Sequence, residues 1–186
     1  MTFRVEKDLL GEKEIEASSY FGINTERALE NFNLQGKTVN LNLVKEIALI
    51  KKAAAVVNKD LKELKTEKAN AIIKASEEVI NGKLDNQFKL SAFQGGAGTS
   101  TNMNVNEVIA NRAIEILGGK KGDYSLVHPL NDVNMSQSTN DVYPTALRIA
   151  AIRRIRKLSS CLSDLQEELQ VKENEFSDKQ LLNFLM

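Results

Sequence analysis

The spacing of apolar residues predicts helices over most of the chain. From Leu43 onward, apolar residues recur every three or four positions, which places them on one face of a helix. The members of this face are Leu43, Ile47, Ile50, Ala54, Val57 and Leu61. A second helix is predicted from its N-cap, Thr66, to Gly82, a residue suited to the position after a helix end. A third begins near Thr101 and ends before Gly118.

The first forty residues follow a different pattern. Residues 3–5 and 14–16 alternate apolar and charged side chains, and Gly11 lies between them. This alternation predicts a hairpin or an extended arm. A short helix is predicted around residues 27–31. The expected fold is therefore mainly α, with a minor β arm at the N-terminus.

The last long segment has the most regular pattern. Asn140 or Asp141 can cap a helix here, and Pro144 suits its first turn. Apolar residues then alternate steps of four and three, and we call this set the heptad seam. Its members are Ala151, Ile155, Leu158, Leu162, Leu165, Leu169 and Phe176. A partner chain, further sequence or the helices of residues 43–81 can bury such a seam, and the pattern alone does not choose among them.

Composition excludes several classes of protein. The 186 residues amount to one domain, or to one domain with an appendage. Lys plus Arg and Asp plus Glu both number 25, so the chain lacks the basic excess of a nucleic-acid binder. No apolar run is long enough to cross a membrane, and the N-terminus is too charged for a signal peptide. One cysteine, Cys161, and one histidine, His128, exclude an intrachain disulfide and argue against a zinc site. We expect a cytoplasmic protein without a metal.

Two polar segments rich in small residues interrupt the helical pattern. Residues 94–107 contain the run Gly95-Gly96-Ala97-Gly98, and residues 128–141 are rich in Asn, Ser and Thr. Each segment leads directly into a predicted helix. Free backbone N–H groups and the helix dipole favour an anion there, and hydroxyls and amides add neutral donors. The pattern suits a small carboxylate or phosphate. In the simpler alternative these residues only cap helices.

Other chemistry has weaker support. The glycine run is followed by neither Gly-Lys-Ser/Thr nor the spacing Gly-x-Gly-x-x-Gly, so nucleotide binding is not indicated. His128 could serve as a general base, but no carboxylate stands at a spacing that would orient it. A lone histidine is more often structural.

Three segments carry a resemblance to a known family. Residues 96–108 (GAGTSTNMNVNEV), residues 136–145 (SQSTNDVYPT) and residues 20–32 (YFGINTERALENF) resemble signatures of the aspartase/fumarase superfamily. Within it, the chain is most similar to the aspartate ammonia-lyase branch. The run Ser-Thr-Asn at 138–140 has the form of that branch, whereas class II fumarases usually have two serines before the asparagine.

The resemblance implies a reaction and a set of substrate-binding residues. The reaction is the reversible elimination of ammonia from L-aspartate to give fumarate, without a cofactor. Removal of the Cβ proton leaves an aci-carboxylate, which preorganised donors stabilise. The resemblance places Thr99, Ser138 and Thr139 at the β-carboxylate. It places Asn140 and Thr99 at the amino group, with Thr139 as a further candidate there and Asn102 close by.

The resemblance also implies an assembly. Residues 1–139 would form an N-terminal lyase domain, and residues 140–186 would begin a central helical bundle. Complete family members are homotetramers whose active sites combine segments of three subunits. His128 matches the histidine of a second carboxylate site of fumarases, but Leu130 stands where asparagine is common, which argues against that site.

Two family segments do not occur in this sequence. A Gly-Arg-Thr-x-x-Gln motif is expected soon after Asp178, and the Gly-Ser-Ser loop that carries the serine base is also absent. The catalytic base is therefore unknown here, and we expect a truncated chain or frameshift product that is inactive alone. The alternatives are a class II fumarase-like fragment and a non-catalytic carboxylate-binding or interaction protein. Neither nucleic acid nor a membrane is an expected partner.

Overall fold

The computed structural model describes residues 2–34 and 36–177, and it confirms a mainly helical chain with a small two-stranded sheet. The chain forms two compact units, residues 1–148 and 149–186. The elements of the chain are β1 (Phe3–Asp8), β2 (Gly11–Glu16), α1 (Ile23–Asn31), α2 (Leu41–Asp60), α3 (Thr66–Ile80), the 3-10 turn η1 (Asp85–Gln87), α4 (Thr99–Ile116), the π-helical turn η2 (Pro129–Val133) and α5 (Thr139–Phe176). The break expected after Asp178 lies outside the described residues.

The predicted hairpin is confirmed. Strands β1 and β2 pair antiparallel, in a register that runs from Phe3 opposite Glu16 to Asp8 opposite Gly11. A two-residue turn joins the strands, and Gly11 has a φ of +118°, which favours glycine. Ile15 is buried, as its place between two charged residues predicts. In β1 the apolar residues face outward instead: Phe3 and Val5 are 56% and 62% exposed, and the charged Glu6 is buried. The alternation therefore predicts the strands but not the inner face of β1.

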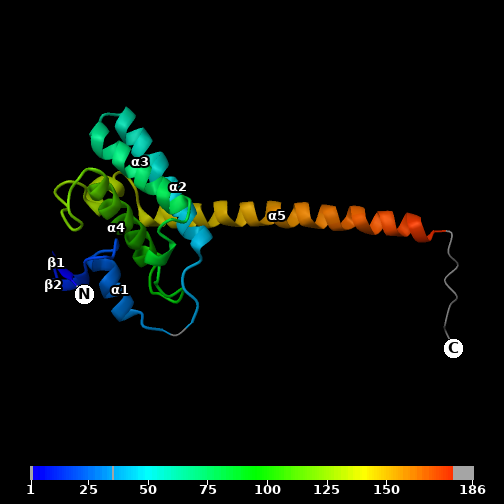
Figure 1. Cartoon of the computed structure of the whole chain (residues 1–186), viewed down its shortest axis with the longest axis horizontal. Helices are drawn as coiled ribbons and strands as arrows, with labels where there is room; N and C mark the ends of the chain where they lie inside the picture. Colours follow the sequence, from blue (N-terminus) through cyan, green and yellow to red (C-terminus); the bar gives the residue numbers. More distant parts are fainter. Residues whose placement is uncertain (1, 35, 178–186) are drawn as a thin grey trace. The chain divides into compact units, whose positions relative to one another are not determined.

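Helix α4 is the central element of the first unit. It contacts α1, α2, α3 and η2, and every residue from 101 to 111 is buried. Helices α2 and α3 lie side by side next to it (Figure 1). Five of the buried α4 residues are Asn or Glu, which explains why its sequence shows no clear apolar stripe. The helix is surrounded by protein, and its polar side chains have to find partners there.

One of those side chains, Glu107, fixes helix α1 onto α4. Its carboxylate oxygens accept hydrogen bonds from the backbone N–H groups of Gly22, Asn24 and Thr25 at 2.8 to 3.1 Å, and from the Thr25 hydroxyl at 2.6 Å. These are the free donors at the start of α1, where the helix dipole also favours a negative charge. Burial raises the pKa of the Glu107 carboxyl, and the hydrogen bonds from Thr25 and Asn24 oppose that rise.

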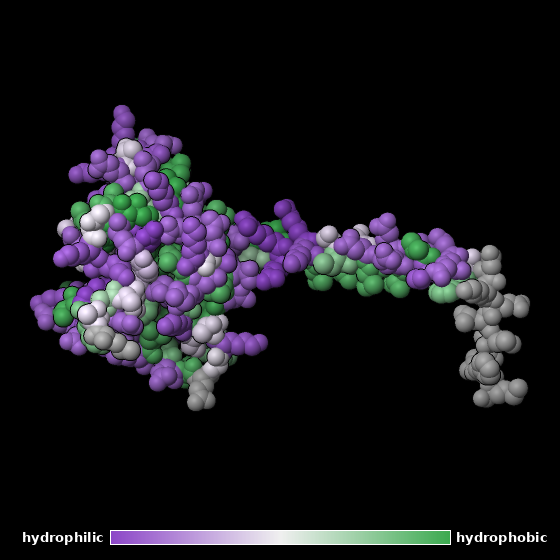
Figure 2. Space-filling model, viewed as in Figure 1, coloured by the Kyte–Doolittle hydropathy of each residue, from purple (hydrophilic) through white to green (hydrophobic). Residues whose placement is uncertain are grey.

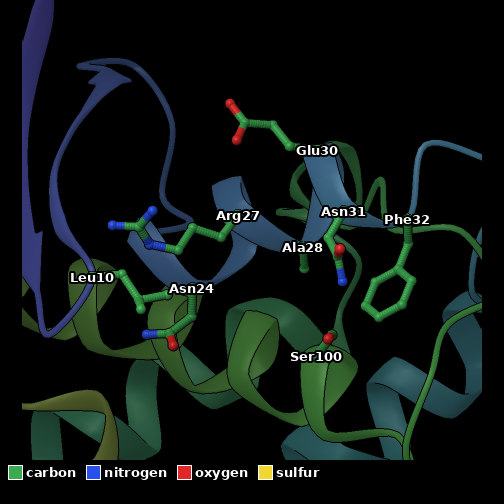
Figure 3. Close-up of a pocket in the computed structure, with 8 residues that line it drawn as sticks. All are labelled: Leu10, Asn24, Arg27, Ala28, Glu30, Asn31, Phe32 and Ser100. Carbon is green, nitrogen blue, oxygen red and sulfur yellow. The ribbon is translucent and has the colours of Figure 1, made fainter.

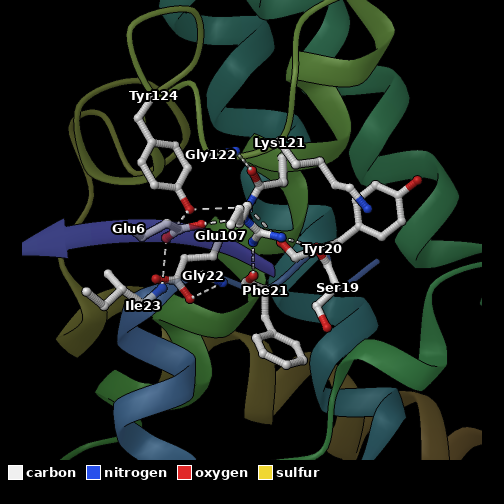
Figure 4. Close-up of polar contacts among 12 residues, drawn as sticks. Glu6, Ser19, Tyr20, Phe21, Gly22, Ile23, Glu107, Lys121, Gly122 and Tyr124 are labelled. Atoms are coloured by element: carbon white, nitrogen blue, oxygen red, sulfur yellow. Dashed lines mark hydrogen bonds and ion pairs between the residues drawn. The ribbon is translucent and has the colours of Figure 1, made fainter. Parts of the chain in front are cut away.

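A second buried carboxylate, Glu6, joins the hairpin to the same corner (Figure 4). It accepts from the backbone N–H of Ile23 at 2.9 Å and from the Tyr124 hydroxyl at 3.0 Å, and Arg4 pairs with it at 2.8 Å. A Cβ on Gly22 would lie 2.4 Å from the Tyr124 oxygen, so only glycine fits between these groups.

The predicted face of α2 is only partly correct. Leu43 and Ile47 are buried as expected, but Val57 and Leu61 are 54% and 65% exposed. In the second half of the helix, the buried positions hold Lys51, Ala55 and Asn58 instead. The loop around Met135 covers that side and offers oxygen acceptors, so polar residues are buried where an apolar period cannot reveal them.

The second unit consists of one described element, the part of α5 from residue 149 to Phe176. Taken by itself, it has no second helix against which the heptad seam could pack. The large seam side chains are between 47% and 65% exposed, and Figure 2 shows them as a hydrophobic strip along the helix. No helix among the described residues is long and apolar enough to cross a membrane.

Candidate functional site

The two polar segments meet at the starts of two helices. Thr99 is the first residue of α4, and Thr139 is the first residue of α5. A cleft of about 270 Å³ lies between the segments. The first segment lines it with Gln94, Gly96, Ala97 and Gly98, and the second with Asn140. Ala92, just before the first segment, and Tyr143 and Pro144 of α5 complete the lining.

Gly98 allows this close approach. It is the N-cap of α4 and has a φ of +83°, in the left-handed region. A Cβ built on it would lie 2.2 Å from Cδ2 of Tyr143. The glycine is therefore required both by the backbone conformation and by contact with the first turns of α5.

The start of α4 has an unexpected cap. Gly98 has no side chain, and the Oε1 atom of Gln94 accepts instead from the backbone N–H and the hydroxyl of Thr101, at 3.1 and 3.0 Å. The Gln94 amide nitrogen donates to the carbonyl of Ser91 at 2.8 Å. Gln94 thus holds the glycine loop at both ends. A glutamine seven residues ahead of its acceptor site is not a recognised capping signal, so the sequence did not reveal it.

Asn102 and Thr139 are brought together. The Nδ2 atom of Asn102 donates to the Thr139 hydroxyl oxygen at 3.0 Å and to Oδ1 of Asn134 at 3.2 Å. Asn102 is only 1% exposed, so it lies beneath the site, whereas Thr139 is partly exposed above it. This hydrogen bond joins the first turn of α4 directly to the start of α5.

The remaining predicted residues are more dispersed. Thr99, Ser138 and Asn140 are exposed, but only Asn140 lines the 270 Å³ cleft. Ser138 lines a separate cleft of about 180 Å³, next to Ile50 of α2. The Ser138 hydroxyl accepts from the backbone N–H of Asn140 at 3.2 Å, which is a local capping bond.

His128 also has a capping role. Its Nδ1 atom accepts from the backbone N–H groups of Leu130 and Asn131, at 3.1 and 3.2 Å, at the start of η2. The proton of the neutral ring is therefore on Nε2. His128 and Leu130 line another cleft, of about 570 Å³, together with Tyr124. The predicted second carboxylate site would have to lie there, away from Thr139 and Asn140.

A further cleft, of about 620 Å³, lies beside α1 and includes Ser100 (Figure 3). Its cation, Arg27, extends toward the hairpin and pairs with both carboxylate oxygens of Asp8 at 2.7 Å. That pair lowers the pKa of Asp8. Arg27 therefore already has an anionic partner within the fold.

Lys51 is a residue of the site that the sequence pattern missed. Its side chain is fully buried, and Nζ donates to Oδ1 of Asn134 at 2.7 Å and to Oε1 of Gln137 at 3.0 Å. Burial lowers the pKa of Lys51 to about 7. Lys51 takes part in no ion pair among the described residues. In the same part of the chain, no group of His, Cys, Asp and Glu could hold a metal ion.

Comparison with known proteins gives consistent matches. The model of a lyase family matches residues 11–182. The chain is 49% identical over 174 residues to an aspartate ammonia-lyase of Bacillus subtilis and 48% identical over 179 residues to a class II fumarate hydratase of Wigglesworthia glossinidia brevipalpis. These alignments cover 94% and 96% of this chain but 37% of each relative, so the chain spans little more than a third of their length.

Solved structures agree with the sequence matches. A fumarate lyase:delta crystallin from Brucella melitensis superposes with a TM-score of 0.91 at 49% identity, over 95% of this chain and 42% of that one. A class II fumarase from Schistosoma mansoni superposes with a TM-score of 0.76 at 41% identity, over 80% of this chain and 32% of that one. The fold, the three signature segments and these matches place the chain in the lyase family of aspartate ammonia-lyases and class II fumarases, the aspartase/fumarase superfamily.

Proposed function

We propose that the chain supplies one substrate-binding segment of an aspartate ammonia-lyase, which eliminates ammonia reversibly from L-aspartate to give fumarate. The observation that carries the proposal is the junction of the two polar segments. The glycine loop and Asn140 line one cleft, and a hydrogen bond joins Asn102 to Thr139 beneath it.

The chemistry of the junction suits a carboxylate that gains charge. Loss of the Cβ proton would leave two negative charges on the neighbouring carboxylate. Hydroxyl and amide donors at two helix N-termini stabilise such charge without providing a competing acid. In this proposal Thr99, Ser138 and Thr139 bind the β-carboxylate, and Asn140 holds the amino group. Ser138 would have to turn from its present cleft toward Asn140 when the substrate binds.

A class II fumarase activity is the second candidate. The fumarate hydratases of Wigglesworthia and of Ralstonia nicotianae are both 48% identical to the chain, which nearly equals the 49% of the aspartate ammonia-lyase. Thr139 favours the ammonia-lyase, because the resemblance gives fumarases a serine at that position. Comparing the binding of L-aspartate with that of L-malate to the purified chain separates the two candidates: tighter binding of L-aspartate would favour the ammonia-lyase, and tighter binding of L-malate the fumarase.

We further propose that residues 1–139 act as an N-terminal lyase domain and residues 140–186 as the start of a central helical bundle. In a homotetramer of complete family members, the serine base and the groups that bind the α-carboxylate would come from segments of other subunits that this sequence does not contain. The purified chain is then expected to bind fumarate weakly and to release none from aspartate. Fumarate release by the purified chain, abolished by Thr99→Ala, would show that the base lies within it.

The binding test uses the purified chain with ¹⁵N labelling. Titration with fumarate should shift the backbone signals of Thr99, Thr139 and Asn140, and Thr99→Ala should weaken binding about fivefold, the value of one hydrogen bond. The matched control is Thr66→Ala, because Thr66 is the exposed first residue of α3 as Thr99 is of α4. Equal effects of the two variants, or shifts confined to other parts of the chain, would contradict the proposal.

A further inference from the structure

We propose that Lys51 is a positioning residue that fixes, through Asn134 and Asn102, the direction in which the Thr139 hydroxyl donates its hydrogen bond. The inference rests on the proposed function, because the outward donor of Thr139 matters for a bound carboxylate. It concerns a residue of α2 that lies beneath the site and has no place in the substrate-binding set described above.

The argument begins with the chemistry of the lysine. Below its pKa of about 7, Lys51 is an ammonium group. An ammonium group has three donors and no acceptor, so any amide that faces it has to present oxygen. Asn134 and Gln137 both do so, at 2.7 and 3.0 Å. Their nitrogens are also engaged: Asn134 donates to the carbonyl of Gln137 at 2.9 Å, and Gln137 donates to the carbonyl of Val133 at 3.0 Å. Both amides are therefore held in one orientation.

The orientation of Asn134 in turn determines the orientation of the Asn102 side chain on α4. Lys51 fixes the side-chain oxygen of Asn134, and this atom also accepts hydrogen bonds from Asn102 at 3.2 Å and from Asn106 at 3.3 Å. Asn102 consequently turns its NH₂ group toward the site, and its second N–H donates to the Thr139 oxygen at 3.0 Å. A hydroxyl that accepts on this side keeps its own proton for a ligand on the other side.

The buried network shows the cost of this orientation. Oδ1 of Asn102 and Oδ1 of Asn106 are buried and have no hydrogen-bond partner. Turning the Asn102 amide over would give its oxygen a donor, the Thr139 hydroxyl, but that hydroxyl would then point inward and be lost to a ligand. The present orientation leaves a buried oxygen unsatisfied, which is normally unfavourable, and the direction imposed by Lys51 accounts for it.

A purely structural role does not explain a lysine at this position. The side chain is fully buried and pairs only with neutral amides, and an uncharged side chain of similar length would fill the same space with less loss of hydration. What the ammonium adds is an obligatory direction of donation. Buried polar groups are known to specify one arrangement among alternatives, and here the arrangement ends at the predicted carboxylate donor.

The affinity test is a double-mutant cycle on fumarate binding by the purified chain, at a pH below the Lys51 pKa of about 7, with the variants Lys51→Met, Thr139→Val and both together. Each single change should weaken binding about fivefold, and the double variant should bind like Thr139→Val alone, because Lys51 acts only through that hydroxyl. The matched control is Lys52→Met. Lys52 is the adjacent lysine on the same helix, and it pairs with Glu77 on the surface at 2.8 Å. Additive effects, or an unchanged affinity of Lys51→Met, would overturn the inference.

A second measurement does not depend on the ligand, so failure of the proposed function can be told apart from failure of this inference. In the presence of Lys51, Thr139→Val should move the side-chain NH₂ signals of Asn102, because it removes their acceptor. In the Lys51→Met background, Thr139→Val should leave the Asn102 NH₂ signals in place, because the Asn102 amide is then no longer held with its NH₂ group toward Thr139. Lys51→Gln provides a second background if Lys51→Met does not fold, because a glutamine amide can present either atom. An equal shift of the Asn102 signals in all backgrounds would show that Lys51 does not orient Asn102, and it would overturn the inference.

Discussion

Individual polar side chains determine how the elements of the first unit meet. Glu107 holds the start of α1 against α4, and Lys51 holds the loop that precedes α5 against α2. Both side chains are fully buried, and both bind backbone or amide groups more than 80 residues away in the sequence. The apolar pattern cannot show such pairs, because their spacing depends on the tertiary fold and not on a helical or strand period.

The pKa of Lys51 predicts how stability depends on pH. Burial lowers this pKa from 10.5 to about 7 in the folded chain. Between those two values the unfolded chain binds more protons than the folded chain, so the free energy of unfolding should rise with pH. The rise should amount to a few kcal/mol and should be absent from Lys51→Met. Urea unfolding across this pH range measures it, and Lys52→Met should behave like the unmodified chain.

Replacement of Glu107 tests the carboxylate at the start of α1. In Glu107→Gln, one of the two acceptor oxygens becomes an NH₂ group that faces the N–H donors of Gly22, Asn24 and Thr25. We expect a loss of about 2–4 kcal/mol in stability, because a buried site loses charged hydrogen bonds. The lower midpoint of denaturant unfolding would report it. Glu63→Gln, at an exposed position, should change the midpoint little, and equal effects would refute the assignment.

Whole elements were predicted more reliably than the residues that join them. The hairpin and the end of α4 follow from alternation and glycine signals that are local in the sequence. The predicted N-cap of α3 is wrong: Thr66 is the first residue of the helix, its N-cap is Lys65, and no side chain caps it. The inner face of α2, the Gln94 cap and the capping role of His128 did not follow. Each of these depends on a polar group supplied by a loop, and a loop has no period from which its partners could be inferred.

In the candidate site, too, some placements follow from the sequence and others do not. Asn102 and Thr139 were expected to lie together, and a hydrogen bond joins them. Ser138 and Asn140 are only two residues apart, yet they line different clefts. The helical start at residue 139 turns successive side chains in different directions, so neighbours in a motif need not share a cavity. Their roles toward a substrate stay predictions.

The two glycines that flank α4, Gly98 and Gly118, allow the penalty of the left-handed backbone to be measured separately from the penalty of a steric clash. Gly98 and Gly118 have φ values of +83° and +81°, but a Cβ on Gly118 would meet nothing within 4 Å. Gly118→Ala should therefore cost about 1 kcal/mol, the penalty for the left-handed conformation alone. Gly98→Ala should cost clearly more, because its Cβ collides with Tyr143. Thermal unfolding compares them, and equal losses would mean that Tyr143 moves away freely.

At the scale of the whole molecule, the exposed seam of the second unit predicts self-association. Ile155, Leu158, Leu162, Leu165 and Leu169 are each more than half exposed along one helix. A continuous apolar strip of this kind marks an interaction surface, and a heptad spacing suits another helix. We expect oligomers in light scattering at high concentration, and Leu162→Lys should reduce them. Ser160→Lys, outside the seam, should not, and a monomeric chain at all concentrations would contradict the prediction.

The contact between Gly98 and Tyr143 has a practical consequence. The chain contains no tryptophan, so fluorescence excited in the tyrosine absorption band comes from its three tyrosines, Tyr20, Tyr124 and Tyr143. Of these, only Tyr143 lines the cleft between the two polar segments. Entry of a small anion beside the glycine loop would change the surroundings of a single emitting ring. The unlabelled chain therefore carries its own optical reporter of that cleft.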